Sequence, residues 1–159
     1  MGRAPSAGAM RGLEGRAEAV APTMTAQAVA NTLWAYATMG RAPGAGVMRG
    51  LEGRAEAVAG SFNPQDVANT LWALCVVSTL CVASEDARPW VHAAVKRLVS
   101  LVSLGDTESF KTAQLCQLHQ FFVLCSVEGE RCVVALDDVG ALRDACRLAF
   151  VCSKTTPSA

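Results

Sequence analysis

The chain has 159 residues, of which 52% are hydrophobic and 18% are charged, and this composition excludes a protein that is disordered throughout. Fourteen Lys and Arg residues balance fourteen Asp and Glu residues, and residues 1–78 alone hold six Arg and five acidic side chains. Affinity for nucleic acid comes largely from Lys and Arg that displace counterions from phosphates, so this balance lends nucleic-acid binding no general support.

The first half of the chain repeats itself at an offset of 38 residues. RAPSAGAMRGLEGRAEAV…VANTLWA, within residues 3–39, returns as RAPGAGVMRGLEGRAEAV…VANTLWA within 41–77, and about two thirds of the positions are identical. Such self-similarity is typical of stacked helical units that bury their apolar faces against their neighbours. The sequence therefore predicts an all-α fold, a right-handed α-solenoid of antiparallel helix pairs. Solenoids bind extended partners and seldom catalyse reactions.

Each unit begins with a weakly specified helix, expected at 6–20 and again at 44–58. Met10, Leu13, Ala17 and Val20 form a narrow apolar stripe along the first of these helices. Glycines within the pattern each cost a helix about 1 kcal/mol relative to Ala. We therefore expect packing against neighbours, and not intrinsic propensity, to hold this helix in place.

The second helix of each unit has clearer signals. Thr25 and Asn63 are the expected N-caps, and Pro64 follows Asn63 at the first helical position. Gly40 is placed to end the first copy. The expected apolar face comprises Val29, Ala30, Leu33, Trp34 and Ala37, and the same face recurs at Val67, Ala68, Leu71, Trp72 and Cys75.

Beyond Val77 the pattern predicts three further helices, over 86–104, 108–127 and from Asp137 or Asp138 to about Cys152. Asp106 or Thr107 is the expected cap of the middle helix. In the last helix the residues expected to face inward are Val139, Leu142, Cys146, Leu148 and Ala149. The segment LCQLHQFF takes the place of VANTLWA, 47 or 48 residues further on. We divide the chain into repeat 1 (3–39), repeat 2 (40–77), a degenerate repeat 3 (78–127), a terminal helix (128–152) and a frayed tail (153–159).

Little in the sequence indicates chemistry. His92 and His119 have no companion ligand or nucleophile at a useful spacing, and no glycine-rich phosphate loop follows a strand. We therefore expect no enzyme activity, no metal and no cofactor.

The apolar run over 67–83 contains Asn and Thr, which favours a buried helix over a membrane span. Seven cysteines without a CxxC pair are expected to be reduced and buried: Cys75, Cys81, Cys116, Cys125, Cys132, Cys146 and Cys152.

The string FNPQDVANTLWA at 62–73, with its 38-residue period, resembles the octotricopeptide repeats of algal and protist organelle proteins, which are related to the helical repeats of RAP-domain and FAST-kinase-like proteins. The resemblance implies an α-solenoid that binds single-stranded RNA in a mitochondrion or chloroplast and acts in RNA processing, stability or translation. It implies no catalytic residues. The chain is much shorter than such arrays and lacks a RAP module, which suggests a fragment, and Glu14 and Glu18 argue against a transit peptide at its start.

Six residues are candidate RNA contacts. Amide side chains can present a donor and an acceptor to a base edge, and arginines can meet phosphate. Alternatively, the amides simply lie on the solvent-exposed side of their helices, and the arginines form ion pairs with Glu14 and Glu52. Trp34 and Trp72 could stack on bases, although packing between repeats is favoured. The candidates are Gln27, Asn31, Gln65 and Asn69 on the second helices, and Arg11 and Arg49 on the first helices.

Two functions fit this reading. The first is a helical-repeat protein that binds organelle RNA, which the motif favours. The alternative is an α-solenoid scaffold that binds other proteins and no RNA, which the neutral charge favours. A continuous Arg-lined surface would support RNA, whereas an exposed apolar groove would support a protein partner.

Overall fold

The computed structural model describes residues 5–80, 88–103, 109–128 and 140–155, and in these residues the chain forms helices and turns with no strand. This confirms the all-α class. The predicted caps Asp106, Thr107, Asp137 and Asp138 lie outside the described residues, as do Cys81 and Cys132.

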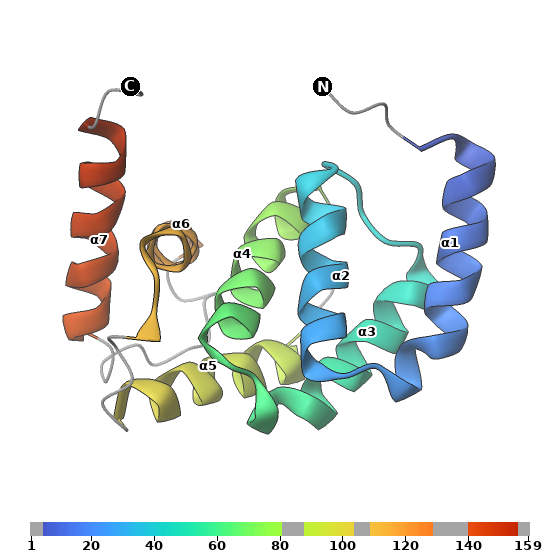
Figure 1. Cartoon of the computed structure of the whole chain (residues 1–159), viewed down its shortest axis with the longest axis horizontal. Helices are drawn as coiled ribbons and strands as arrows, with labels where there is room; N and C mark the ends of the chain where they lie inside the picture. Colours follow the sequence, from blue (N-terminus) through green and yellow to red (C-terminus); the bar gives the residue numbers. More distant parts are fainter. Residues whose placement is uncertain (1–4, 81–87, 104–108, 129–139, 156–159) are drawn as a thin grey trace.

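The described helices follow the predicted order (Figure 1). They are α1 (Ala7–Val20), the 3₁₀ turn η1 (Ala21–Thr23), α2 (Ala26–Thr38), α3 (Ala45–Val58), the 3₁₀ turn η2 (Ala59–Ser61), α4 (Pro64–Leu80), α5 (Arg88–Ser103), α6 (Thr112–Glu128) and α7 (Gly140–Thr155). The first four helices match the predicted ranges closely. Among the later bounds, α4 continues to Leu80, beyond the expected end of repeat 2 at 77, α6 begins four residues later than expected, and α7 continues to Thr155.

Side-chain caps explain where the second helices begin. Thr25 Oγ1 accepts a hydrogen bond from the Ala28 N–H (3.2 Å), as predicted. Asn63 Oδ1 accepts from the Asp66 N–H (2.9 Å) while Asp66 Oδ2 accepts from the Asn63 N–H (3.1 Å), so the two side chains satisfy each other's backbone donors. A similar hydrogen bond marks the start of α6. Gln114 Oε1 accepts from the N–H of Lys111, the residue before the helix (2.9 Å).

Gly40 ends α2 as predicted, in a left-handed conformation with φ of 61°. The Arg41 N–H donates to the Tyr36 carbonyl (3.1 Å) and the Gly40 N–H donates to the Ala37 carbonyl (3.0 Å). These two bonds satisfy carbonyls that the helix end leaves without intrahelical partners. They also turn the chain sharply toward α3.

The helices pack in two rows. In one row α3 lies between α1 and α5; in the other α4 lies between α2 and α6, and α7 packs against α6 (Figure 1). Contacts of α2 with α3 and of α4 with α5 join the rows. Sequential helices thus alternate between the rows up to α6.

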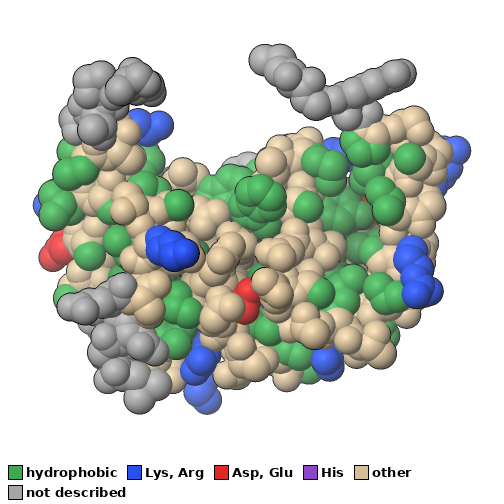
Figure 2. All heavy atoms as spheres, in the orientation of Figure 1, with side chains coloured by type: hydrophobic (Ala, Val, Ile, Leu, Met, Phe, Trp, Pro, Cys, Tyr) green, Lys and Arg blue, Asp and Glu red, His purple; other side chains and the backbone are tan. Residues whose placement is uncertain are grey.

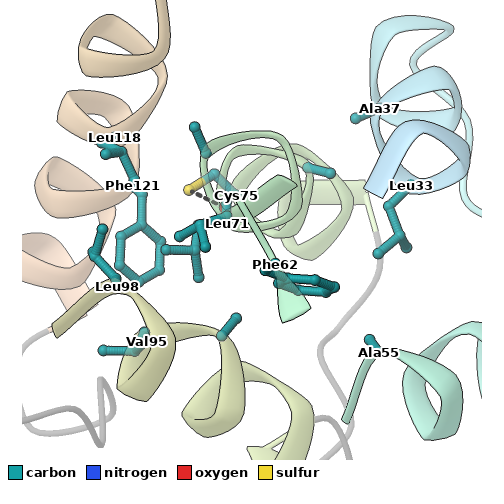
Figure 3. Packing of buried hydrophobic residues seen from close by; sticks show 14 of the residues in the cluster. Leu33, Ala37, Ala55, Phe62, Leu71, Cys75, Val95, Leu98, Leu118 and Phe121 are labelled. Carbon is teal, nitrogen blue, oxygen red and sulfur yellow. Dashed lines mark hydrogen bonds between the residues drawn. The ribbon is translucent and has the colours of Figure 1, made fainter. Parts of the chain in front are cut away.

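The core lies between the rows. Phe62, Leu71 and Leu98 are fully buried there, and Figure 3 shows Leu71 and Cys75 of α4 between residues of α5 and α6. Burying each such side chain contributes about 1.5–3 kcal/mol. Across α2, the predicted apolar face is buried at Val29, Ala30, Leu33 and Ala37.

Three predicted inward positions are wrong. Leu13 is 59% exposed, because no described residue covers this side of α1; Leu148 is 66% exposed, because α7 turns Leu142 and Cys146 toward α6 instead. Trp34, expected to pack between repeats, is 39% exposed. Each lies on the solvent side of a helix whose other side is buried.

The cysteine prediction is confirmed for three side chains. Cys75, Cys125 and Cys146 are buried, whereas Cys116 is half-buried and Cys152 is exposed. Burial, with a smaller contribution from Cys116, raises the pKa of the Cys146 thiol to about 12. Cys146 therefore stays protonated and unreactive at neutral pH. Among the described helices, none is both long and apolar enough to cross a membrane.

Candidate nucleic-acid interface

Three amide side chains form a hydrogen-bonded row across α2, α4 and α6. Asn69 Nδ2 donates to Asn31 Oδ1 (3.5 Å), and Gln117 Nε2 donates to Asn69 Oδ1 (3.2 Å). Asn31 and Asn69 are the same position of successive repeats, 38 residues apart. We call Asn31, Asn69 and Gln117 the amide row. The structure therefore brings the two predicted asparagines together, and it adds Gln117, which the sequence analysis did not single out.

The amide row corrects one predicted RNA contact. Asn69 is buried, and its amide group is already bonded on both sides. It therefore cannot offer both a donor and an acceptor to a base edge, and its role is to hold α4 between its neighbours. The predicted contacts Gln27, Asn31 and Gln65 are exposed.

Tryptophans follow the amides on the same helix faces, three residues further along. Trp34 lies one turn beyond Asn31, and Trp72 lies one turn beyond Asn69. The Trp72 indole is half-buried, and its Nε1–H donates to Oε1 of the exposed Gln120 on α6 (2.7 Å). The outer side of α2, α4 and α6 thus combines solvent-facing amides with indole rings. We call Gln27, Asn31, Trp34, Gln65, Trp72 and Gln120 the amide–indole face.

Few charges belong to this row of helices. The only charged residues in the sequences of α2, α4 and α6 are Asp66 and Glu128, the last residue of α6. The Asp66 side chain is buried at the N-terminus of α4. Burial raises the pKa of its carboxyl group, and the hydrogen bond from the Asn63 N–H lowers this pKa by a smaller amount. No exposed carboxylate is therefore found among the described side chains of these three helices.

The predicted arginines lie in the other row of helices. Arg11 on α1 and Arg49 on α3 are both exposed. The Glu14 carboxylate, an alternative partner for Arg11, accepts a hydrogen bond from the Tyr36 hydroxyl (3.5 Å). Burial and the Glu14 charge raise the pKa of that hydroxyl. On the side of the molecule shown in Figure 2, Lys and Arg side chains are scattered and do not form a continuous patch.

A concave region lies between α6 and α7. Its volume is about 420 Å³, and its lining includes His119, Phe122, Ser126, Arg143 and Arg147. The guanidinium of Arg143 lies 5.9 Å from the centre of the Phe122 ring, and the His119 ring lies 4.6 Å from that of Phe150. This region was not predicted from the sequence, in which His119 has no companion ligand or nucleophile at a useful spacing. The signal that could have indicated it is the Arg143/Arg147 pair, one helical turn apart.

The described residues assemble no group of side chains that could hold a metal ion. No group of three or more His, Cys, Asp or Glu side chains comes close enough there to hold a metal ion. The expectation of a protein without metal, cofactor or enzyme activity stays a prediction.

Comparisons with known proteins add no identification: no family model, no curated protein and no solved structure matches the chain. Any statement of function therefore depends on the chain's own residues.

Proposed function

We propose that this chain is a helical-repeat protein, an α-solenoid with a 38-residue repeat, that binds single-stranded RNA on its amide–indole face. By the resemblance of FNPQDVANTLWA to octotricopeptide repeats, the RNA is an organelle transcript, in a mitochondrion or chloroplast, and binding affects its processing, stability or translation. Single-stranded RNA is read through unstacked bases that stack on aromatic rings and bond to polar side chains.

The amide–indole face carries this proposal. Asn31 and Trp34 on α2, followed by Trp72 on α4 and Gln120 on α6, put donors, acceptors and aromatic surface on adjacent helices. Stacking of one base on an aromatic side chain is worth about 1–3 kcal/mol. Helical-repeat RNA readers use one base per repeat, and on this face Gln27 and Gln65, like Trp34 and Trp72, are separated by one 38-residue repeat.

The repeat arrangement has support from contacts that recur between units. Arg54 Nε on α3 donates to the Met24 carbonyl (2.7 Å), and Arg97 Nε on α5 donates to the Phe62 carbonyl (2.8 Å). Met24 and Phe62 are equivalent positions, each the residue before an N-cap. One arginine from each following unit therefore bonds the same point of the preceding unit, as stacking of like units requires.

The test is a binding measurement of the purified chain with single-stranded RNA. We expect Trp34→Ala to weaken binding by about 10-fold, since the exposed indole offers stacking that Ala cannot replace. Val123→Ala, which removes an exposed apolar side chain on α6 outside the amide–indole face, is the matched control and should leave affinity unchanged. No retention of RNA even at low salt would overturn the proposal for this chain.

A protein partner is the second candidate, and the outer side of α7 favours it. Leu148 and Val151 are exposed there, on the side that faces away from α6. Figure 2 shows hydrophobic side chains at the surface of this helix. If Leu148→Asp abolishes a protein interaction while RNA binding is absent, the chain is a scaffold and not an RNA reader.

A further inference from the structure

Identical residues of the two repeats have different surroundings. The sequence of α1 from Met10 to its end is the same as that of α3 from Met48 to its end. Leu51 on α3 is completely buried, whereas Leu13, its counterpart on α1, is 59% exposed. In the described residues α1 and α3 each contact a helix of the following unit, and only α3 also contacts one of a preceding unit. The missing cover on Leu13 is therefore what a preceding unit would supply.

The glycines show the same difference. A Cβ added to Gly50 would lie 2.9 Å from the Cβ of Ala21 in the preceding unit, and one added to Gly46 would overlap the Glu18 carboxylate. Gly50 must lack a side chain for α3 to approach η1 so closely, whereas at Gly46 the nearest atoms are the end of the flexible Glu18 side chain. Their counterparts Gly8 and Gly12 have no atom within 4 Å of an added Cβ. Glycine weakens a helix, and at Gly8 and Gly12 no contact in the described residues requires it.

Two sets of polar side chains also have a partner in the preceding unit in repeat 2 and none in repeat 1 of the described residues. Arg54 and Arg97 donate to backbone carbonyls of the unit before them, whereas Arg16, the counterpart of Arg54, is exposed and has no such acceptor in the described residues. In the amide row each side chain donates to the preceding unit, from Gln117 to Asn69 and from Asn69 to Asn31. Within the described part of the chain, Asn31 Nδ2 has no acceptor.

We infer that the outer side of α1, together with the Asn31 end of the amide row, is the docking surface for a further helix pair of the same repeat. The α1/η1–α3 interface defines what this partner presents. It offers a carboxylate over Gly8, as Glu18 does over Gly46, and a small side chain against Gly12, as Ala21 does against Gly50. It also offers a backbone carbonyl to Arg16 and an amide oxygen to Asn31. This inference rests on the repeat arrangement proposed above and not on RNA binding.

The experiment supplies the partner directly. A copy of residues 3–40 is placed before Arg3 of the full chain, so that the junction follows Gly40 as the natural one does. Thermal unfolding is measured for the natural and the extended chain, each with and without Gly12→Leu. In the natural chain Gly12→Leu should leave the midpoint unchanged or raise it, because the site is open. In the extended chain it should lower the midpoint by several degrees, because Leu would meet the added unit.

Gly15→Leu is the matched control, since neither Gly15 nor its counterpart Gly53 has an atom within 4 Å of an added Cβ. It should have the same effect in both chains. Hydrogen exchange gives a readout that needs no variant: amides of α1 should exchange more slowly in the extended chain.

Three results would overturn the inference. These are equal effects of Gly12→Leu in the two chains, unchanged exchange of α1, and dimerisation of the natural chain that Gly12→Leu abolishes. The last result would assign the surface to a second copy. None of the three concerns RNA, so failure here leaves the proposed RNA binding to its own test.

Discussion

At the scale of single residues, position along the stack decides what a side chain contributes. Leu13 and Leu51 have the same neighbours in sequence, yet one faces solvent and the other lies in the core. A buried leucine loses both its transfer free energy and its packing contacts when truncated, whereas an exposed one loses little. The two leucines therefore form a natural pair for measuring the stability that stacking adds.

We expect Leu51→Ala to lower the free energy of unfolding by about 2–5 kcal/mol. Leu13→Ala should change it by less than about 0.5 kcal/mol, because the side chain is mostly exposed already. Urea unfolding followed by circular dichroism measures both. Equal losses would mean that α1 is covered in solution.

The buried carboxyl of Asp66 makes stability depend on pH. Its pKa is raised from 3.8, chiefly by burial, so the folded state binds this proton more tightly than the unfolded state does. The contribution of Asp66 to stability is therefore largest below the unfolded pKa and is lost as pH rises through the folded pKa. Asp66→Asn keeps an oxygen for the Asn63 N–H but does not titrate. Between pH 3 and pH 6, its free energy of unfolding should rise relative to the wild type.

Urea titrations of both proteins at several pH values measure this difference, and the other carboxyl groups cancel in the comparison. A wild type that gains stability relative to Asp66→Asn as pH rises would show that the pKa is lowered instead. The sign of the change in relative stability with pH shows whether the pKa of Asp66 is raised or lowered in the folded state.

At the scale of elements, caps at the helix ends were the most dependable sequence signals. Thr25, Asn63 and Gly40 act where the sequence places them, because each satisfies backbone groups within its own segment. The start of α6 was wrong for a related reason. Asp106 and Thr107, the caps expected from residue type, lie outside the described residues; Gln114 satisfies the N–H of Lys111, and the described helix begins at Thr112.

Removing the cap of α4 should weaken the whole chain, since α4 contacts helices in both rows. We expect Asn63→Ala to cost about 0.5–2 kcal/mol of the free energy of unfolding. Gln65→Ala, two residues along and exposed, should change it by less than about 0.5 kcal/mol. Denaturant unfolding of the three proteins tests this. An equal effect of both variants would show that the capping bonds do not stabilise α4.

Lateral contacts between elements could not be predicted in the same way. A helical wheel places Asn31 and Asn69 opposite the apolar faces of their own helices, which is correct for Asn31. It does not show that helices 38 residues apart lie side by side with those amides in register. For Gln117 the sequence left two alignments of LCQLHQFF with VANTLWA, at 47 and at 48 residues, and only the offset of 48 places Gln117 at the Asn69 position.

At the scale of the whole molecule, the arginines lie outside the three helices that carry the amide–indole face. Arginines occur along α1, α3, α5 and α7, whereas α2, α4 and α6 contain none. Ligand binding on the amide–indole face would therefore depend on stacking and hydrogen bonds more than on phosphate neutralisation. The overall balance of charge in the sequence indicated weak electrostatics, and the structure shows which helices carry the arginines.

We therefore expect the affinity for single-stranded RNA to depend weakly on salt. Each neutralised phosphate of a single strand adds about 0.7 to the slope of log K against log salt, so a slope below about 2 in magnitude is expected. The double variant Arg11→Gln with Arg49→Gln should leave this slope unchanged, because both side chains lie in the other row. Filter binding across a salt series measures it. A steep slope that falls by about 1.4 in the double variant would restore both arginines as phosphate contacts.

The amide row also has a chemical polarity. Every link in it runs from nitrogen to oxygen in one sense along the molecule, so its terminal groups are unlike: Asn31 ends it with an N–H and Gln117 with a carbonyl. Aligned amide dipoles reinforce one another. A group that joins at Asn31 must bring a lone pair, and one that joins at Gln117 must bring a hydrogen, so the row favours a single orientation for whatever extends it.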